Sequence, residues 1–119
     1  MKGLRILLVE DEVLVALALE DMLIDMGSKV VGPAYSLSEA LTLIDSAEID
    51  GAILDVNLGG ERVYPVADIL AARHIPFVFI TGYGSAGLRD LDRNRPVLQK
   101  PYRADSLAEI IRGWRLSRA

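Results

Sequence analysis

Side chains that can do chemistry stand at the ends of four separate apolar segments of this sequence. Two acids, Glu10 and Asp11, follow the first segment, and Asp55 ends the second. Thr81 and Lys100 follow the other two. Carboxylates held close together suit a hard divalent cation such as Mg²⁺, and a carboxylate can also attack phosphorus to form an acyl phosphate. A lysine and a hydroxyl would then stabilise the charge that develops on the phosphoryl oxygens.

The elements that must bring these groups together are short strands that alternate with helices. Apolar runs predict five buried strands, namely Arg5–Val9, Lys29–Gly32, Gly51–Asp55, Ile75–Ile80 and Pro96–Leu98. Helical spacing and capping signals predict one helix over about Glu12–Met26, a second after the N-cap Ser36, and a third over about Glu61–Arg73 with Pro65 in its first turn. A final helix is predicted near the C-terminus, where Leu107, Ile110, Ile111 and Trp114 fall on one helical face. Any helix between Gly82 and Arg95 should be short. The alternation predicts a doubly wound α/β domain, whose site lies beyond the carboxyl ends of the strands.

The composition bounds the class of protein. The chain has 119 residues, 51% of them apolar, which suffices for one packed domain over residues 1–119 without disulfides. The absence of cysteine excludes a disulfide scaffold, a thiolate zinc site and a cysteine nucleophile. The first apolar run, Ile6–Val9, is too short for a signal peptide or a membrane span, so we expect a cytoplasmic protein. A net charge of −4 argues against direct binding of nucleic acid.

Four segments resemble the motifs of the response-regulator receiver domain of two-component signalling. They are Leu7–Glu12, Ile53–Leu58, Ile80–Gly82 and Lys100–Tyr102, in the family's order and over essentially the whole chain. The resemblance implies a flavodoxin-like, five-stranded parallel sheet in the order 2-1-3-4-5. It also implies that a histidine kinase or a phosphotransfer protein donates a phosphoryl group from phosphohistidine, and that the product switches contacts with a downstream protein. Such a domain would catalyse only its own phosphorylation and dephosphorylation.

The same resemblance implies which residues hold the metal ion and the phosphoryl group. Asp55 would be the phosphoacceptor and one of the metal ligands. Asp11 would contact Mg²⁺ directly and Glu10 through water, and the main-chain carbonyl of Asn57 would be a further ligand.

The implied switch departs from the usual receiver pattern. Thr81 would be the switch hydroxyl and Lys100 the phosphate partner, with a cis bond to Pro101. However, the family's usual aromatic residue three positions before the lysine is Val97 here. We therefore expect that ordering of Tyr83–Arg95 on phosphorylation replaces the inward swing of an aromatic ring.

The run Phe79–Gly84 resembles a branch of receivers that lack this aromatic and are nicknamed for a Phe-Ala-Thr-Gly run. Members are often stand-alone and are associated with histidine kinases of the HWE type. The resemblance therefore implies a receiver without an output domain. A homodimer through the last two strands and helices, which is common in the family, stays open.

Two other classes of function compete with this interpretation. A phosphatase of the haloacid-dehalogenase type also uses an aspartyl nucleophile, but it usually has a second acid two residues later, where this chain has Asn57. A flavodoxin-like cofactor binder is the other alternative, although the sequence contains neither Gly-x-Gly-x-x-Gly nor a Gly-Lys-Ser/Thr phosphate loop. The single histidine, His74, is interpreted as a helix C-terminal residue and Trp114 as a packing residue.

Overall fold

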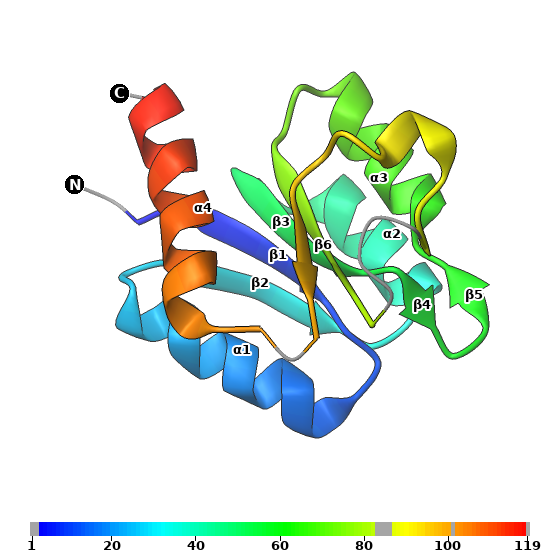
Figure 1. The fold of residues 1–119 in the computed structure, drawn as a ribbon, viewed down its shortest axis with the longest axis horizontal. Coiled ribbons are helices and arrows are strands. Elements are labelled where there is room, and N and C mark those ends of the chain that lie inside the picture. Colours follow the sequence, from blue (N-terminus) through cyan, green and yellow to red (C-terminus); the bar gives the residue numbers. More distant parts are fainter. Residues whose placement is uncertain (1–2, 83–86, 101, 119) are drawn as a thin grey trace.

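Five parallel strands form the central sheet. The computed structural model describes residues 3–82, 87–100 and 102–118, and the strand order within them is β2-β1-β3-β6-β7 (Figure 1). In that order the strands are β2 (Lys29–Ala34), β1 (Arg5–Val9), β3 (Gly51–Asp55), β6 (Phe77–Thr81) and β7 (Val97–Gln99). Because β6 and β7 are the fourth and fifth strands of this sheet along the chain, the order confirms the predicted 2-1-3-4-5 arrangement.

Two helices cover each face of the sheet (Figure 1). One face carries α1 (Val13–Asp25) and α4 (Ala104–Arg118), and the other carries α2 (Leu37–Ser46) and α3 (Tyr64–Ala72). Two buried apolar clusters lie between the helices and the sheet. Strand β1 contributes to both, since alternate residues of a strand point to opposite faces: Leu7 and Val9 to the α2–α3 side, Ile6 and Leu8 to the α1–α4 side. Burial on both sides is why these strands are continuously apolar.

The predicted cap of α2 is present. The backbone N–H of Glu39 donates to Ser36 Oγ at 3.2 Å, and the N–H of Tyr35 donates back to Glu39 Oε2 at 3.1 Å. This reciprocal pair satisfies two donors at the helix start and fixes where α2 begins.

Strand β2 is longer than the sequence predicted. It continues to Ala34 instead of ending at Gly32. The register shifts between the pairs Leu7–Val31 and Val9–Ala34, and Gly32 sits at a φ of 103°. A glycine at positive φ lets the strand accommodate an extra residue and rejoin its neighbour, so the glycine marks a bulge and not a strand end.

Helix α3 begins at Tyr64, later than the predicted start near Glu61. The reason is a small antiparallel hairpin, in which β4 (Asn57–Leu58) pairs with β5 (Glu61–Arg62). Residues engaged in strand pairing cannot also form the first turn of a helix. Pro65 lies in the first turn of α3, as predicted.

The turn of the hairpin consists of two glycines at positive φ. Gly59 has a φ of 59° and Gly60 a φ of 97°, which is the backbone that a two-residue hairpin turn requires. The side-chain oxygen of Asn57 accepts from the N–H of Gly60 at 3.1 Å, and the N–H of Val63 donates to the carbonyl of Val56 at 3.0 Å. These bonds hold the hairpin in place directly after β3.

Residues 87–95, the described part of the segment between β6 and β7, contain no α-helix, which agrees with the prediction that any helix between Gly82 and Arg95 should be short. They contain the 3₁₀ turn η2 (Asp90–Asp92). The side chain of Asp92 is 1% exposed and accepts from Arg89 Nε at 2.7 Å and from Arg95 Nε at 3.1 Å. A buried carboxylate shared by two guanidinium groups therefore stabilises this segment in place of helical hydrogen bonds.

The same two arginines attach the segment to α3 and to the sheet. Arg89 donates to Asp68 of α3 at 2.8 Å, which lowers the pKa of that carboxyl, and its guanidinium lies 4.1 Å from the centre of the Tyr64 ring. The guanidinium of Arg95 lies 4.6 Å from the centre of the Phe77 ring. We call Asp68, Arg89, Asp92 and Arg95 the Asp92 cluster.

The last helix packs through Trp114, which is 7% exposed, and this confirms its interpretation as a packing residue. A Cβ atom at Gly51 would lie 2.6 Å from the tryptophan ring, so only glycine lets the ring approach β3 this closely. His74 follows α3 with a φ of 58°, consistent with its prediction as a C-terminal helix residue. Within the described residues, no helix combines the length and the apolarity that crossing a bilayer requires.

Candidate functional site

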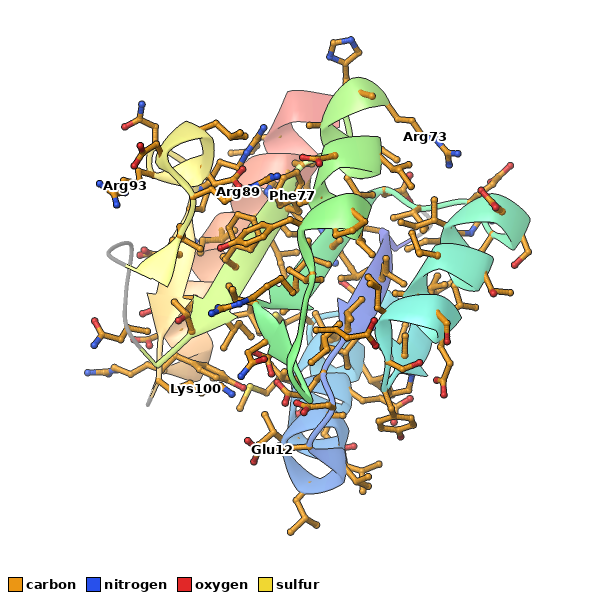
Figure 2. All side chains as sticks on the ribbon, turned by 90° about the vertical axis from the view of Figure 1, so that its right-hand side faces the viewer. Glu12, Arg73, Phe77, Arg89, Arg93 and Lys100 are labelled. Carbon is orange, nitrogen blue, oxygen red and sulfur yellow. The ribbon has the colours of Figure 1, made fainter. Side chains whose placement is uncertain are left out.

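The carboxyl ends of four strands bring the predicted site residues to one edge of the sheet. Glu10 directly follows β1, Asp55 and Thr81 end β3 and β6, and Lys100 follows β7. The N–H of Lys100 donates to the carbonyl of Thr81 at 2.9 Å, so neighbouring strands end side by side. Figure 2 shows Glu12 and Lys100 at the same end of the molecule. The predicted convergence is therefore present.

Three carboxylates crowd together at this edge. One oxygen from each of Glu10, Asp11 and Asp55 lies within 4.8 Å of the others. Glu10 is fully buried and Asp55 is 6% exposed, whereas Asp11 is half-buried. Glu10 Oε1 accepts from the N–H of Glu12 at 3.1 Å, but the buried Oε2 has no hydrogen-bond partner among the described residues. A buried oxygen without a partner is costly unless something else neutralises it.

The pKa values of the site residues reflect the same cost of burying charged oxygens. Burial raises the pKa of Glu10 to about 8, the charge of Asp55 adds to the increase, and the N–H of Glu12 and the charge of Lys100 oppose it. Burial also raises the pKa of Asp55, although Lys100 lowers it. The protein therefore holds two carboxylates where their ionised forms are disfavoured, and a cation between them would favour ionisation of both.

Lys100 offsets the negative charge of these carboxylates without forming a hydrogen bond to either of them. Its Nζ lies 3.8 Å from Glu10 Oε2 and 3.8 Å from Asp55 Oδ2, which is beyond hydrogen-bond length. The lysine side chain is 30% exposed, so it borders both the carboxylates and solvent. The position suits a cation that attracts an incoming anion toward Asp55 without closing off its carboxylate.

A cleft of about 460 Å³ opens beside the carboxylates. Its lining comes from the carboxyl ends of four strands, from the residues that follow them and from the hairpin. It consists of Asp11, Glu12, Asp55, Val56, Asn57, Arg62, Thr81, Gly82, Gly87 and Lys100. An added Cβ at Gly82 would meet no described atom within 4 Å, so this glycine borders open space. The cleft thus unites the predicted site residues except Glu10, whose buried carboxylate is not part of the lining.

Five lining residues were not among the predicted site residues. Glu12, Val56 and Gly82 directly follow predicted residues in the sequence, whereas Arg62 and Gly87 do not. Arg62 reaches the cleft because the hairpin folds β5 back beside Asn57. The pair Gly59-Gly60 between two short runs is a hairpin signal that could have revealed this. Gly87 lies in the segment after Thr81, and its carbonyl accepts from the Tyr64 hydroxyl at 3.4 Å, a contact that no sequence pattern indicates.

These groups fit a magnesium ion. Three carboxylates with mutually close oxygens supply hard oxygen ligands, and the cleft leaves space for the waters that Mg²⁺ retains. Glu10 Oε2 has no hydrogen-bond partner among the described residues, and burial raises the pKa values of Glu10 and Asp55, so a bound cation would stabilise the ionised form of both carboxyls. Asn57 also lines the cleft, two residues after Asp55, and its N–H donates to Asp55 Oδ1 at 3.4 Å.

A doubly wound sheet that gathers carboxylates and a lysine at its carboxyl edge is the arrangement that the resemblance to receiver domains predicted. The family model described as response regulator receiver domain matches residues 6–112. The chain belongs to this family, whose members act in two-component signalling. Family membership favours the receiver interpretation over the phosphatase and the cofactor binder.

Several known proteins resemble the chain over nearly its whole length. The solution structure of SdrG from Sphingomonas melonis Fr1 is 46% identical and superposes with a TM-score of 0.83, covering 94% of this chain and 96% of that one. A BeF₃-activated conformation of SdrG superposes with a TM-score of 0.77 at 47% identity, covering 94% of this chain and 97% of that one. The receiver domain of the sensor histidine kinase PA1611 from Pseudomonas aeruginosa PAO1, solved with a magnesium ion in its active-site cleft, is 26% identical with a TM-score of 0.81, covering 94% of this chain and 97% of that one.

Among curated relatives, the phyllosphere-induced regulator PhyR of Methylorubrum extorquens is 32% identical over 114 residues. The match covers 90% of this chain and 42% of PhyR. A match to the regulatory protein PdtaR of Mycobacterium tuberculosis covers 53% of that protein. The chain therefore spans about half the length of the curated relatives that it matches.

Proposed function

We propose that this domain, residues 1–119, is a phosphoryl-accepting switch in which Asp55 receives a phosphoryl group in the presence of Mg²⁺. The observation that supports this most directly is the cluster of Glu10, Asp11 and Asp55 beside the cleft, with Lys100 Nζ 3.8 Å from Asp55. The donor is a phosphohistidine of a histidine kinase or a phosphotransfer protein. The P–N bond of the donor breaks, a P–O bond to Asp55 forms, and the electron pair of the broken bond stays on the imidazole, which takes up a proton.

Each residue of the site has a proposed role in that transfer. Asp11 would hold Mg²⁺ directly and Glu10 through water, and the carbonyl of Asn57 and the carboxylate of Asp55 would complete the protein ligands. The metal, when bound, neutralises charge on the phosphoryl oxygens. An oxygen of Asp55 is the nucleophile, and Asp55 lines the cleft that the donor would enter.

Lys100 and Thr81 act on the product. The ammonium group of Lys100 attracts the phosphoryl oxygens, and its exposure of 30% leaves it room to move toward them. Thr81 is 5% exposed and lines the cleft, so its hydroxyl can donate to a phosphoryl group on Asp55. The resulting shift of the Thr81 backbone would pass to the segment that follows.

The readout of the switch belongs to that following segment. Val97 pairs with Phe79 in the sheet and offers no aromatic ring to swing inward. Residues 83–86 and Pro101 lie outside the described residues, and with them the expected cis bond and part of the Tyr83–Arg95 span. The described part, 87–95, is already attached to α3 by the Asp92 cluster. Rearrangement of the whole span on phosphorylation remains our prediction.

The partners follow from this mechanism. A histidine kinase of the HWE type or a phosphotransfer protein supplies the phosphoryl group, and the phosphorylated domain changes its contacts with a downstream protein in the cytoplasm, or with a second copy of itself. We propose neither nucleic-acid nor membrane binding, and no reaction beyond the domain's own phosphorylation and dephosphorylation.

Incubation of the protein with acetyl phosphate and Mg²⁺ is expected to add the mass of one phosphoryl group. Chelation of Mg²⁺ should abolish the addition, because the crowded carboxylates repel a dianionic donor when no divalent cation offsets their charge. Intact mass spectrometry measures the outcome. Equal labelling with and without chelator would show that the metal has no part in the reaction.

Replacing Lys100 with alanine is expected to leave Mg²⁺ binding intact or slightly tighter, because a positive charge beside Glu10 and Asp55 is removed. Binding of beryllofluoride, a mimic of the phosphoryl group, should weaken by about tenfold or more, as a charge-assisted contact is lost. Titrations monitored by NMR amide shifts give both affinities. Lys29→Ala, an exposed lysine on β2, is the matched control. If Lys100→Ala bound beryllofluoride as tightly as the wild type, Lys100 would not contact the phosphoryl group and its role would be structural.

A further inference from the structure

Arg62 lines the cleft, but the phosphoryl transfer proposed above gives it no role. It is exposed, lines the cleft together with Asp55 and Lys100, and forms no ion pair with any described residue. Other arginines differ in this respect: Arg73, directly after α3, and Arg89, Arg93 and Arg95, in the segment 87–95, all pair with carboxylates. A guanidinium without a carboxylate partner beside an anion-accepting aspartate is available to a ligand.

The hairpin fixes where this guanidinium stands. Arg62 is the direct cross-strand partner of Asn57, which follows Asp55 by two residues. Directly opposed residues of an antiparallel pair project to the same face with their Cβ atoms about 4.5–5.5 Å apart. The two-glycine turn and the bond from the Gly60 N–H to Asn57 Oδ1 keep the register from slipping. The backbone of Arg62 is therefore held opposite Asn57, two residues from Asp55, and its side chain lines the same cleft as Asp55.

The balance of charge in the cleft indicates what Arg62 can bind there. Four carboxylates, Glu10, Asp11, Glu12 and Asp55, lie in or beneath the cleft, against two cations, Arg62 and Lys100. With every carboxylate ionised, the excess is two negative charges, which one Mg²⁺ offsets. A phosphodonor then brings two further negative charges. Lys100 already lies 3.8 Å from two of the carboxylates, so Arg62 is the lining cation that remains for the donor.

We propose that Arg62 binds the phosphoryl oxygens of the donor at the mouth of the cleft and so determines how readily Asp55 is phosphorylated. This inference rests on the proposed function and adds a substrate-contacting residue to it. With acetyl phosphate, an oxygen of Asp55 forms a bond to phosphorus, the bond from phosphorus to the acyl oxygen breaks, and acetate leaves with the electron pair. Arg62 takes no proton in this step, since a guanidinium stays protonated, and it contributes by charge and by planar hydrogen bonds alone.

The test compares Arg62→Ala with the wild-type chain in initial rates of acetyl phosphate labelling at saturating Mg²⁺. The rate below donor saturation should fall at least about tenfold through a raised KM, and Arg62→Lys should recover part of the loss. Beryllofluoride, which has no leaving group, should also bind Arg62→Ala more weakly. Mg²⁺ itself should bind the variant as well as the wild type or better, because a nearby positive charge is gone.

Arg73→Ala is the matched control, since it removes the same charge from an exposed side chain at the far end of α3, away from Lys100 (Figure 2). It should be labelled at the wild-type rate. Labelling of Arg62→Ala at the wild-type rate, or weaker Mg²⁺ binding by that variant, would overturn this inference while leaving phosphorylation of Asp55 standing. A wild-type chain that is not labelled at all would instead overturn the proposed function.

Discussion

Replacing Asp55 with asparagine is expected to abolish incorporation of a phosphoryl group from acetyl phosphate. The amide has nearly the shape of the carboxylate, and its oxygen can still accept from the N–H of Asn57, which donates to Asp55 Oδ1 at 3.4 Å. It lacks the anionic oxygen that attacks phosphorus, so the loss should be complete and not partial. Intact mass spectrometry of the two proteins under identical donor and Mg²⁺ concentrations measures it.

The same variant should remain folded, which separates lost chemistry from lost structure. Burial raises the pKa of Asp55, so the folded state disfavours the ionised carboxylate relative to the unfolded chain. This penalty acts above the ordinary pKa of aspartate, including at neutral pH, and a neutral amide avoids it. The free energy of unfolding of Asp55→Asn should therefore equal or exceed that of the wild type at neutral pH.

Asp45→Asn is the matched control for this experiment, because Asp45 is 79% exposed on α2 and lies outside the cleft. It should be labelled like the wild type. Labelling of Asp55→Asn at the wild-type rate would mean that another residue accepts the phosphoryl group, and the assignment of Asp55 would then be wrong.

Replacing Asp92 with alanine is expected to lower the free energy of unfolding by about 2–3 kcal/mol. The carboxylate is 1% exposed and serves as the shared acceptor for Arg89 and Arg95, so its removal leaves two guanidinium groups without that acceptor. The loss falls below the full cost of breaking a buried pair because the arginine side chains are 28% and 35% exposed and regain some hydration. Urea denaturation followed by circular dichroism gives the difference.

Two further substitutions test whether the effect belongs to the Asp92 cluster. Asp90→Ala removes a carboxylate from the same 3₁₀ turn, but Asp90 is 93% exposed and pairs, within the described part of the chain, only with Arg93, so stability should hardly change. Asp92→Asn keeps an acceptor oxygen and should fall between the wild type and Asp92→Ala. If Asp92→Ala were as stable as the wild type, the Asp92 carboxylate would contribute nothing to stability, and the other contacts of the segment, such as Arg89 with Asp68, would suffice to hold it.

The cluster also connects stability to signalling. Gly87 borders the cleft, and its carbonyl accepts from the hydroxyl of Tyr64, whose ring Arg89 covers. The segment between β6 and β7, which borders the cleft, is thus attached to α3 within a few residues of Thr81. Val97 of β7 replaces the aromatic residue that usually moves in receivers. We therefore expect phosphorylation to change the surface at this attachment instead.

Much of the fold could be predicted from the sequence because its signals are local. Continuous apolar runs such as Arg5–Val9 mark strands buried on both faces, and the Ser36 cap marks a helix start without reference to the rest of the chain. The errors were local as well. A glycine at positive φ was interpreted as the end of β2, and the apolar spacing after Gly60 hid the short pairing of β5 ahead of α3.

The sequence by itself determined which groups meet at the site. Parallel strands end at one edge of a sheet, so residues that follow strands, such as Asp55 and Lys100, had to converge once the alternation was recognised. The tertiary structure alone decided the raised pKa of Glu10, the entry of Arg62 into the cleft and the burial of Asp92 between two arginines. These properties depend on desolvation and on distances between segments remote in sequence, and neither quantity is encoded in the pattern of any one segment.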